Sequence, residues 1–245
     1  MNGIIKKLDN FEMLALKGMG GGGGIESGVE VLSLDAKGKL KELKLYGDTV
    51  PNYGFMYNFY NSGVYPLLIK NDKIKRIGDY AFSDASITFD NGFFENVTQI
   101  GEFGLACYQN KDTEITIPLW DGRDENGSKA DGSIFRKSTN SWLVYNLPKV
   151  QYVGDYWWYQ NSKNITVQIG SIGYPLIKCA ERPFGATSGT GNVTVYTKGE
   201  LLDTISTAIK NQAGANYTFV FKASENTTYN GTAYSSGDTM LTISQ

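Results

Sequence analysis

Because the sequence contains no histidine, carboxylates, tyrosines and lysines are the side chains of this chain that could carry out acid–base chemistry. That absence removes the usual general base and the commonest transition-metal ligand. Asp79, Glu102 and Asp155 are the notable carboxylates, since each lies between a glycine and an aromatic residue. Two carboxyl groups held about 5–10 Å apart in a cleft can hydrolyse a glycosidic bond. Equivalent positions of a repeat more often form a structural ladder, so we expect turn-capping groups and no enzyme, with a carboxylate-dependent glycoside hydrolase as a remote alternative.

The acidic segment DGRDENGSKADGS contains a second set of carboxylates, which are Asp121, Asp124, Glu125 and Asp131. It does not fit an EF-hand calcium loop, because Arg123 occupies the third position and the twelfth residue is not glutamate. We expect a solvated insertion loop without a metal ion. The glycine run near the N-terminus lacks the Gly-Lys-Ser/Thr sequence of a phosphate-binding loop, so the sequence predicts no cofactor.

A sequence repeat indicates which structural elements position these carboxylates. The segments IKRIGDYAF (74–82), VTQIGEFGL (97–105) and VQYVGDYWW (150–158) share apolar residues, a glycine, an acid and an aromatic ring in the same order. The first two copies are 23 residues apart, which falls within the range of leucine-rich-repeat units. The third follows after 53 residues, enough for two units and an insertion at 121–133. One such unit cannot bury its apolar side alone, but stacked units can.

Short alternating runs of β-forming residues predict the strands that such a stack needs. They are VEVLSL, KLKELKL, SITF, TEITIPL, NITVQI and NVTVYT, and turn residues separate them. GELLDTISTAIKN at 199–211 predicts a helix, and Asn230-Gly231 predicts a hairpin turn in the last part of the chain. We therefore expect a mainly β solenoid at 29–199 and a C-terminal helix with a β-hairpin cap at 200–245.

Residues 1–28 are expected to form a separate N-terminal arm. The spacing of apolar residues predicts a short amphipathic helix at 3–17. Five consecutive glycines follow, which can act either as a flexible tether or as a segment laid closely against the backbone of a partner. The residues that we expect to dock onto a partner are Ile4, Leu8, Phe11, Gly20, Gly21, Gly22, Gly23 and Gly24.

The repeat units resemble the BspA-type leucine-rich repeat, whose units read roughly V-x-x-I-G-x-x-A-F followed by L-x-x-I-x-I-P. IKRIGDYAF matches the first part, and TEITIPL, with Pro118 after the strand, matches the second. RPFGATSGTGNVTVYTKGEL at 182–201 is similar to the terminal unit of that family. The resemblance covers about residues 29–205 and departs where Gly-Leu and Trp-Trp replace the usual Ala-Phe. It implies an irregular leucine-rich-repeat solenoid.

Aromatic residues are the candidates for a binding surface, with 16 Tyr, 12 Phe and 4 Trp in the chain. The repeat register places Tyr156 and Trp158 in covering positions over the core, so we expect Trp157 and Tyr159 to face outward. Exposed aromatic residues are common at protein interfaces and on sugar-binding surfaces. A second aromatic cluster at 53–60 adds two further candidates, which are Tyr57 and Tyr60.

The overall composition excludes several classes of partner. The formal net charge of −2 gives no electrostatic footprint for nucleic acid. No apolar run approaches the roughly 18 residues of a membrane span, and charged residues interrupt the N-terminal segment where a secretory signal would need an apolar stretch. Cys107 and Cys179 are expected to be two buried or half-buried thiols, and a single disulfide between them is the alternative.

The family resemblance implies binding or assembly, since such repeats occur in bacterial surface adhesins and in bacteriophage structural proteins. Without a visible export signal, we first expect a virion component of the tail, baseplate or head-fibre and decoration class, assembled in the host cytoplasm. The alternative is a fragment of a bacterial cell-surface adhesin. The expected partners are other structural proteins of the assembly, further copies of this chain, and a host surface protein or glycan.

Overall fold

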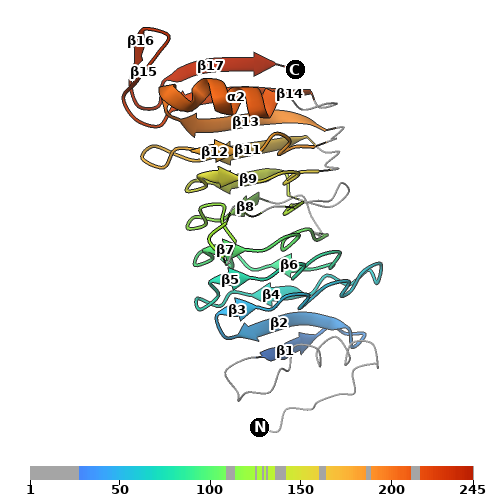
Figure 1. Cartoon of the computed structure of the whole chain (residues 1–245). Helices are drawn as coiled ribbons and strands as arrows, with labels where there is room; N and C mark the ends of the chain where they lie inside the picture. The colour runs from blue at the N-terminus through green and yellow to red at the C-terminus, as the bar shows by residue number, and fades with distance from the viewer. Residues whose placement is uncertain are drawn as a thin grey trace.

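The protein is a mainly β solenoid of about six coils with one short α-helix in its described part (Figure 1). We call one coil a rung. The expected N-terminal helix and the residues proposed for docking, Ile4 to Gly24, lie outside the described residues. The computed structural model describes residues 28–108, 114–124, 126–128, 130, 132–135, 142–159, 164–185, 189–210 and 216–244.

The longest strands form one face of the solenoid, which we call the strand face. They lie in parallel register, so that Leu43 is beside Leu68 and Leu68 is beside Phe89. Antiparallel strands close both ends of this face, β1 beside β2 and β17 beside β14. Between β6 and β8 the described strands are not paired, which divides the face into a four-stranded and a six-stranded sheet. Its strands are β1 (Gly28–Leu34), β2 (Leu40–Tyr46), β4 (Leu67–Ile69), β6 (Thr88–Phe89), β8 (Glu114–Thr116), β9 (Val144–Leu147), β11 (Ile165–Ile169), β13 (Thr190–Thr197), β14 (Asn216–Ala223) and β17 (Thr239–Ser244).

Two-residue strands form a second face and confirm the alignment of the first two repeats. Ile77 in β5 (Arg76–Ile77) lies opposite Ile100 in β7 (Gln99–Ile100), as the 23-residue spacing predicts. Below them, β3 (Thr49–Val50) pairs with β5 in the same way. Further along the solenoid, β10 (Tyr152–Val153) pairs in parallel with β12 (Lys178–Cys179).

A repeated backbone contact joins successive rungs just before this second face. One carbonyl accepts hydrogen bonds from two consecutive amides of the next rung, and the acceptors are those of Asp48, Lys75, Asp121 and Gln151. The rung that begins at Asp121 therefore lies between the second and third sequence repeats. It is the longest of these rungs, with 30 residues to Gln151, which confirms that the insertion belongs there.

Successive backbone turns form the third face, which we call the turn face. Some amides close a turn within their own rung, as the N–H of Ala81 does on the carbonyl of Gly78 at 3.3 Å. The amides between them donate to the next rung, as the N–H of Phe82 does to the carbonyl of Gly104 at 3.1 Å. Among the described residues this face thus contains no strand, yet its rungs are hydrogen-bonded both to themselves and to their neighbours.

The acids of the repeat form the expected ladder along the edge of the turn face. Oδ1 of Asn52 accepts the N–H of Asp79 at 3.0 Å, and Oδ1 of Asp79 accepts the N–H of Glu102 at 3.0 Å. Oδ1 of Asp155 accepts the N–H of Arg182 at 3.2 Å in the same manner. These side chains satisfy amides that the turns leave without a partner in their own rung.

The ladder explains the glycine that precedes each acid. A Cβ on Gly78 would lie 2.2 Å from Oδ1 of Asn52, and a Cβ on Gly101 would lie 2.1 Å from Oδ1 of Asp79. Both distances are far inside van der Waals contact. Neither glycine has the positive φ that would by itself favour glycine. The close approach of the rung below therefore requires these glycines, because its capping side chain occupies the space of a Cβ.

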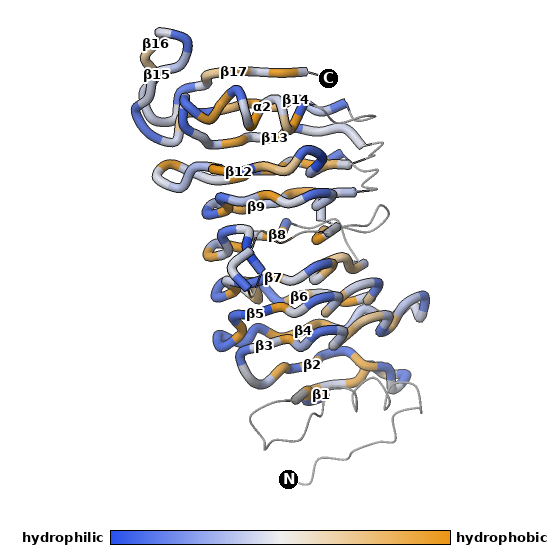
Figure 2. The backbone as a smooth tube through the Cα atoms, in the orientation of Figure 1, coloured by the Kyte–Doolittle hydropathy of each residue, from blue (hydrophilic) through white to orange (hydrophobic). Residues whose placement is uncertain are grey.

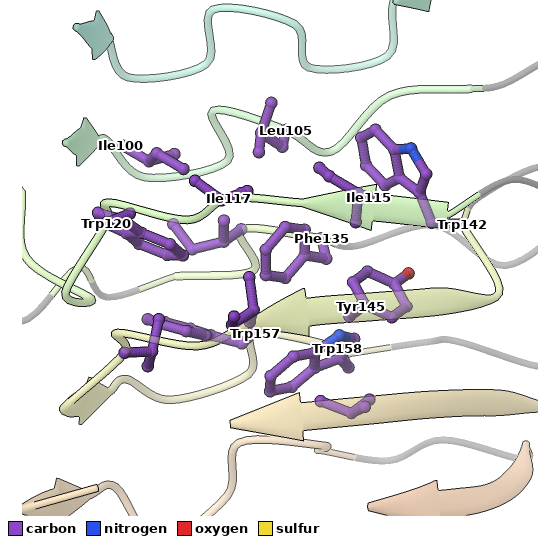
Figure 3. Close-up of a cluster of buried hydrophobic side chains, with 14 of the residues drawn as sticks. Ile100, Leu105, Ile115, Ile117, Trp120, Phe135, Trp142, Tyr145, Trp157 and Trp158 are labelled. Carbon is purple, nitrogen blue, oxygen red and sulfur yellow. The ribbon is translucent and has the colours of Figure 1, made fainter. Parts of the chain in front are cut away.

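Buried apolar residues fill the interior. Figure 2 shows that hydrophobic positions recur along the backbone of successive rungs. Aromatic rings form an inner column beneath the turn face. The rings of Phe55 and Phe82 stack with centroids 5.3 Å apart. Higher up, Phe135 stacks on Trp158 with ring centroids 5.5 Å apart (Figure 3). Trp158 in turn stacks on Phe184 at 4.8 Å.

The C-terminal elements confirm the predicted helix and hairpin. A 3₁₀ turn, η1 (Gly199–Leu201), leads into α2 (Leu202–Lys210), which replaces the second and third faces of the last rung before β14 returns to the sheet. The β15 (Thr227–Tyr229) and β16 (Thr232–Tyr234) hairpin turns at Asn230 and Gly231, whose φ angles are 48° and 77°. The apolar side of α2 is covered by the solenoid through Leu202, Ile205 and Ile209.

Replacing Asp79 by Ala should lower the free energy of unfolding by about 1–2 kcal/mol, because the N–H of Glu102 loses its acceptor. Asp79→Asn should change it by less than about 0.5 kcal/mol, since Asn52, in the rung below, caps the N–H of Asp79 with an amide oxygen. Urea unfolding of the full chain measures both. Equal losses in the two variants would show that the side-chain oxygen does not cap the next rung.

Candidate functional site

A column of aromatic rings covers the turn face of the first three rungs. Tyr53 stacks on Tyr80 with ring centroids 5.4 Å apart, and Tyr80 stacks on Phe103 at 4.8 Å. These residues occupy the same position of the repeat, directly after the capping residue. Tyr53 at the end of the column is 59% exposed.

The backbone directs these rings outward. Tyr53, Tyr80 and Phe103 have φ angles of 60°, 54° and 52°, in the left-handed region that non-glycine residues rarely adopt. The N–H of Tyr53 donates to the carbonyl of Asp79, and the N–H of Tyr80 donates to that of Glu102. The cross-rung bonds and the ring stacking hold a conformation that costs about 1–2 kcal/mol per residue. Burial raises the pKa of the Tyr80 hydroxyl, and the negative charge of Glu102 raises it further.

Tyr57 and Tyr60 follow Tyr53 along the chain and are exposed as expected, at 54% and 45%. Both belong to the same rung as Tyr53, and the ring of Tyr60 lies 5.5 Å from that of Tyr108. We call the exposed side chains of Tyr53, Tyr57 and Tyr60 the tyrosine patch. Its rings present large apolar faces with a polar hydroxyl tip, which suits contact with a protein or a sugar.

Tyr159 does not join the tyrosine patch. It lies in a later rung, where it is half-buried and its ring is 5.3 Å from that of Tyr156. A Cβ on Gly185 would lie 2.7 Å from its ring, so the chain of the next rung packs closely against it. The structure thus brings Tyr57 and Tyr60 together and leaves Tyr159 apart from them.

The expectation that Trp157 faces outward is wrong, because its side chain is 0% exposed. It stacks on Trp120 with ring centroids 4.7 Å apart, and its Nε1–H donates to the carbonyl of Ala130 at 2.7 Å (Figure 3). The equivalent Ala81 is also buried, so this repeat position faces inward in both rungs. Trp120, just before the insertion, and Ala130, within it, provide the partners that allow a tryptophan there.

A cleft of 530 Å³ opens on the strand face between β6 and β8, where the sheet is interrupted. This volume falls within the about 300–1,000 Å³ that ligand sites occupy. Phe89, Phe94 and Trp142 line it with aromatic rings, and the ring of Phe89 lies 4.8 Å from that of Phe94. No pattern in the sequence indicates this cleft.

Carboxylates surround the cleft. Asp90, Glu95 and Glu114 line it, and Asp72 lies nearby through its ion pair with Lys70. Lys70 also bonds to Glu95, and that hydrogen bond raises the pKa of the Lys70 ammonium. Among these described groups four carboxylates face one ammonium, so the cleft is acidic.

The acidic insertion shows how its described carboxylates are used. Oδ1 of Asp121 accepts the N–H of Arg123, and Oδ1 of Asp124 accepts those of Asn126 and Ser128. These are turn contacts of the kind that Asp side chains commonly make. The described residues contain no cluster of three or more side chains suited to a metal ion, and Glu125 and Asp131 lie outside them.

Both cysteines are present as thiols, Cys107 buried and Cys179 half-buried. The described part of the chain has no helix with the length and apolar character that crossing a membrane requires. No protein-family model, curated protein or solved structure matches the chain.

Trp157→Ala should lower the free energy of unfolding by about 3–5 kcal/mol, since it empties a fully buried site. Tyr57→Asn should change it by less than about 1 kcal/mol, because the ring is exposed and Asn tolerates the φ of 59°. Thermal and urea unfolding measure the two variants side by side. A small loss for Trp157→Ala would contradict its place in the core.

Proposed function

We propose that this protein is a non-enzymatic binding and assembly protein that uses its solenoid as a rigid support for a contact surface. The observation that carries the proposal is the tyrosine patch, which stands exposed on a turn face held by cross-rung hydrogen bonds. Side chains on such a support lose little freedom on binding, because the backbone is already fixed. Tyrosine is among the residues enriched at the centres of interfaces.

The carboxylates of the repeat support a structural role better than an enzymatic one. Asp79 and Asp155 each place an oxygen on an amide of the next rung, as Asn52 does without any charge. An amide could not replace a carboxylate that acts as an acid or a nucleophile. The equivalence of Asn52 and Asp79 therefore favours capping over hydrolysis.

We further propose that the rungs are irregular leucine-rich repeats of the BspA type and that the protein is a bacteriophage virion component. The matching segments IKRIGDYAF and TEITIPL support the first part, since their residues take the buried and turn positions that stacked repeats need. The two thiols fit assembly in a reducing host cytoplasm. Its partners would be other structural proteins and further copies of the chain, with the tyrosine patch directed to a host surface protein or glycan.

Changing Tyr53, Tyr57 and Tyr60 together to Asn should reduce adsorption of the particles to host cells by at least about tenfold, because interface tyrosines often contribute more than 1 kcal/mol each. Asn suits the left-handed backbone at Tyr53 and Tyr57, and Tyr60 has no positive φ. Tyr174→Asn is the matched control, since Tyr174 is 44% exposed but belongs to another rung. Equal adsorption by the triple variant and the control would contradict a role for the patch.

Deleting residues 1–24 should leave the solenoid folded but prevent incorporation of the protein into particles. Mass spectrometry of purified particles measures incorporation, and circular dichroism with thermal unfolding of the isolated variant measures folding. Normal incorporation of the truncated protein would refute docking through this arm. Detection of the full chain only in the cell envelope would contradict the virion proposal and favour the alternative, a bacterial adhesin.

A further inference from the structure

We infer that the cleft between β6 and β8 binds an extended peptide segment carrying basic side chains, which adds a strand to the interrupted sheet. This site is separate from the tyrosine patch and does not depend on the function proposed for it. Backbone hydrogen-bonding groups face the cleft from both of its sides.

On the β6 side, one residue directs its amide and carbonyl toward the cleft. The N–H groups of Thr88 and Asp90 donate to β4, through the carbonyls of Pro66 and Leu68. In a parallel ladder the backbone N–H and C=O groups of alternate residues point to opposite neighbouring strands. Those of Phe89 therefore point away from β4. Its amide has no hydrogen-bond partner among the residues that the structure describes.

Ile87, two residues before Phe89, shows which hydrogen bond the amide of Phe89 lacks. Ile87 also points away from β4, and its N–H donates to the carbonyl of Tyr108 in the next rung at 3.2 Å. Tyr108 is the last described residue of that rung before β8, which begins at Glu114. The cleft therefore begins where the regular cross-rung pairing of β6 stops.

On the β8 side, two residues direct their backbone groups toward the cleft. The N–H of Ile117 donates to the carbonyl of Asn146 in β9 at 3.1 Å. By the same alternation Ile115 also faces β9, whereas Glu114 and Thr116 face β6. An extended segment between the two strands would thus find Phe89 on one edge and Glu114 and Thr116 on the other.

The side chains around these edges define the chemistry of the segment. Its alternate residues would point either to the interior or to solvent, as in any strand. The partly exposed ring of Phe89 offers an apolar surface to the inward residues. Glu114 is exposed beside the cleft, and its carboxylate offers a partner to a lysine or arginine on the outward side.

An extended peptide fits these features better than a sugar does. Strand addition uses main-chain donors and acceptors for affinity and side-chain contacts for selectivity, and the cleft presents both. Phe94 is 6% and Trp142 3% exposed, so neither ring offers the open face on which a sugar would stack. The acidic rim then selects among peptides by charge.

The test uses the full chain and a capped seven-residue peptide of alternating lysine and valine with a fluorescent label. Fluorescence anisotropy should show saturable binding that weakens at least about tenfold when glutamate replaces lysine in the peptide. Glu114→Lys should weaken binding of the lysine peptide by about tenfold, and Glu114→Gln by about threefold. Glu200→Gln, an exposed carboxylate at the C-terminal end of the solenoid, should leave it unchanged.

Amide hydrogen exchange followed by NMR separates strand addition from adsorption to an acidic surface. Addition of the lysine peptide should slow exchange at Phe89, Glu114 and Thr116 by at least about tenfold, and a peptide N-methylated at alternate residues should not. Equal binding of the lysine and glutamate peptides would overturn the inference. Binding without protection of these three amides would overturn it as well, as would the absence of saturable binding.

Discussion

Each rung of this protein must lie one strand spacing, about 4.8 Å, above the rung below it on all three faces at once. The strand face meets this constraint by ordinary parallel pairing, which needs no particular residue. The turn face meets it with a side-chain oxygen that reaches the amide of the next rung, as Asp79 does for Glu102. That contact leaves no room for a Cβ on Gly101. The acid of one rung therefore requires the glycine of the next.

The same spacing produces the surface that we propose as the contact site. A residue that follows the cap takes a left-handed conformation so that its amide can reach the rung above. Its side chain then projects outward, where its ring lies at stacking distance from the ring of the neighbouring rung. The aromatic column is thus a consequence of how the rungs are joined, and exposure is greatest at Tyr53, where the column ends.

The two departures from regular stacking have opposite effects on the surface. The insertion after Asp121 gives Trp157 a hydrogen-bond acceptor at Ala130, and Trp120, just before the insertion, is its stacking partner. The interruption after Tyr108 separates β6 from β8 and leaves a cleft with strand edges on both sides. An irregularity in the stack can therefore either enlarge the core or open a site, according to where on the circumference it falls.

The sequence alone determined the stack, the register of 74–82 on 97–105, and the C-terminal helix and hairpin, because glycine, acid and apolar spacing act within one rung or between equivalent positions. It also placed the exposed Tyr57 and Tyr60 correctly. Only the tertiary structure decided the burial of Trp157 and the opening of the cleft. Both depend on how neighbouring rungs meet, and that contact joins residues whose separation in the sequence carries no periodic signal.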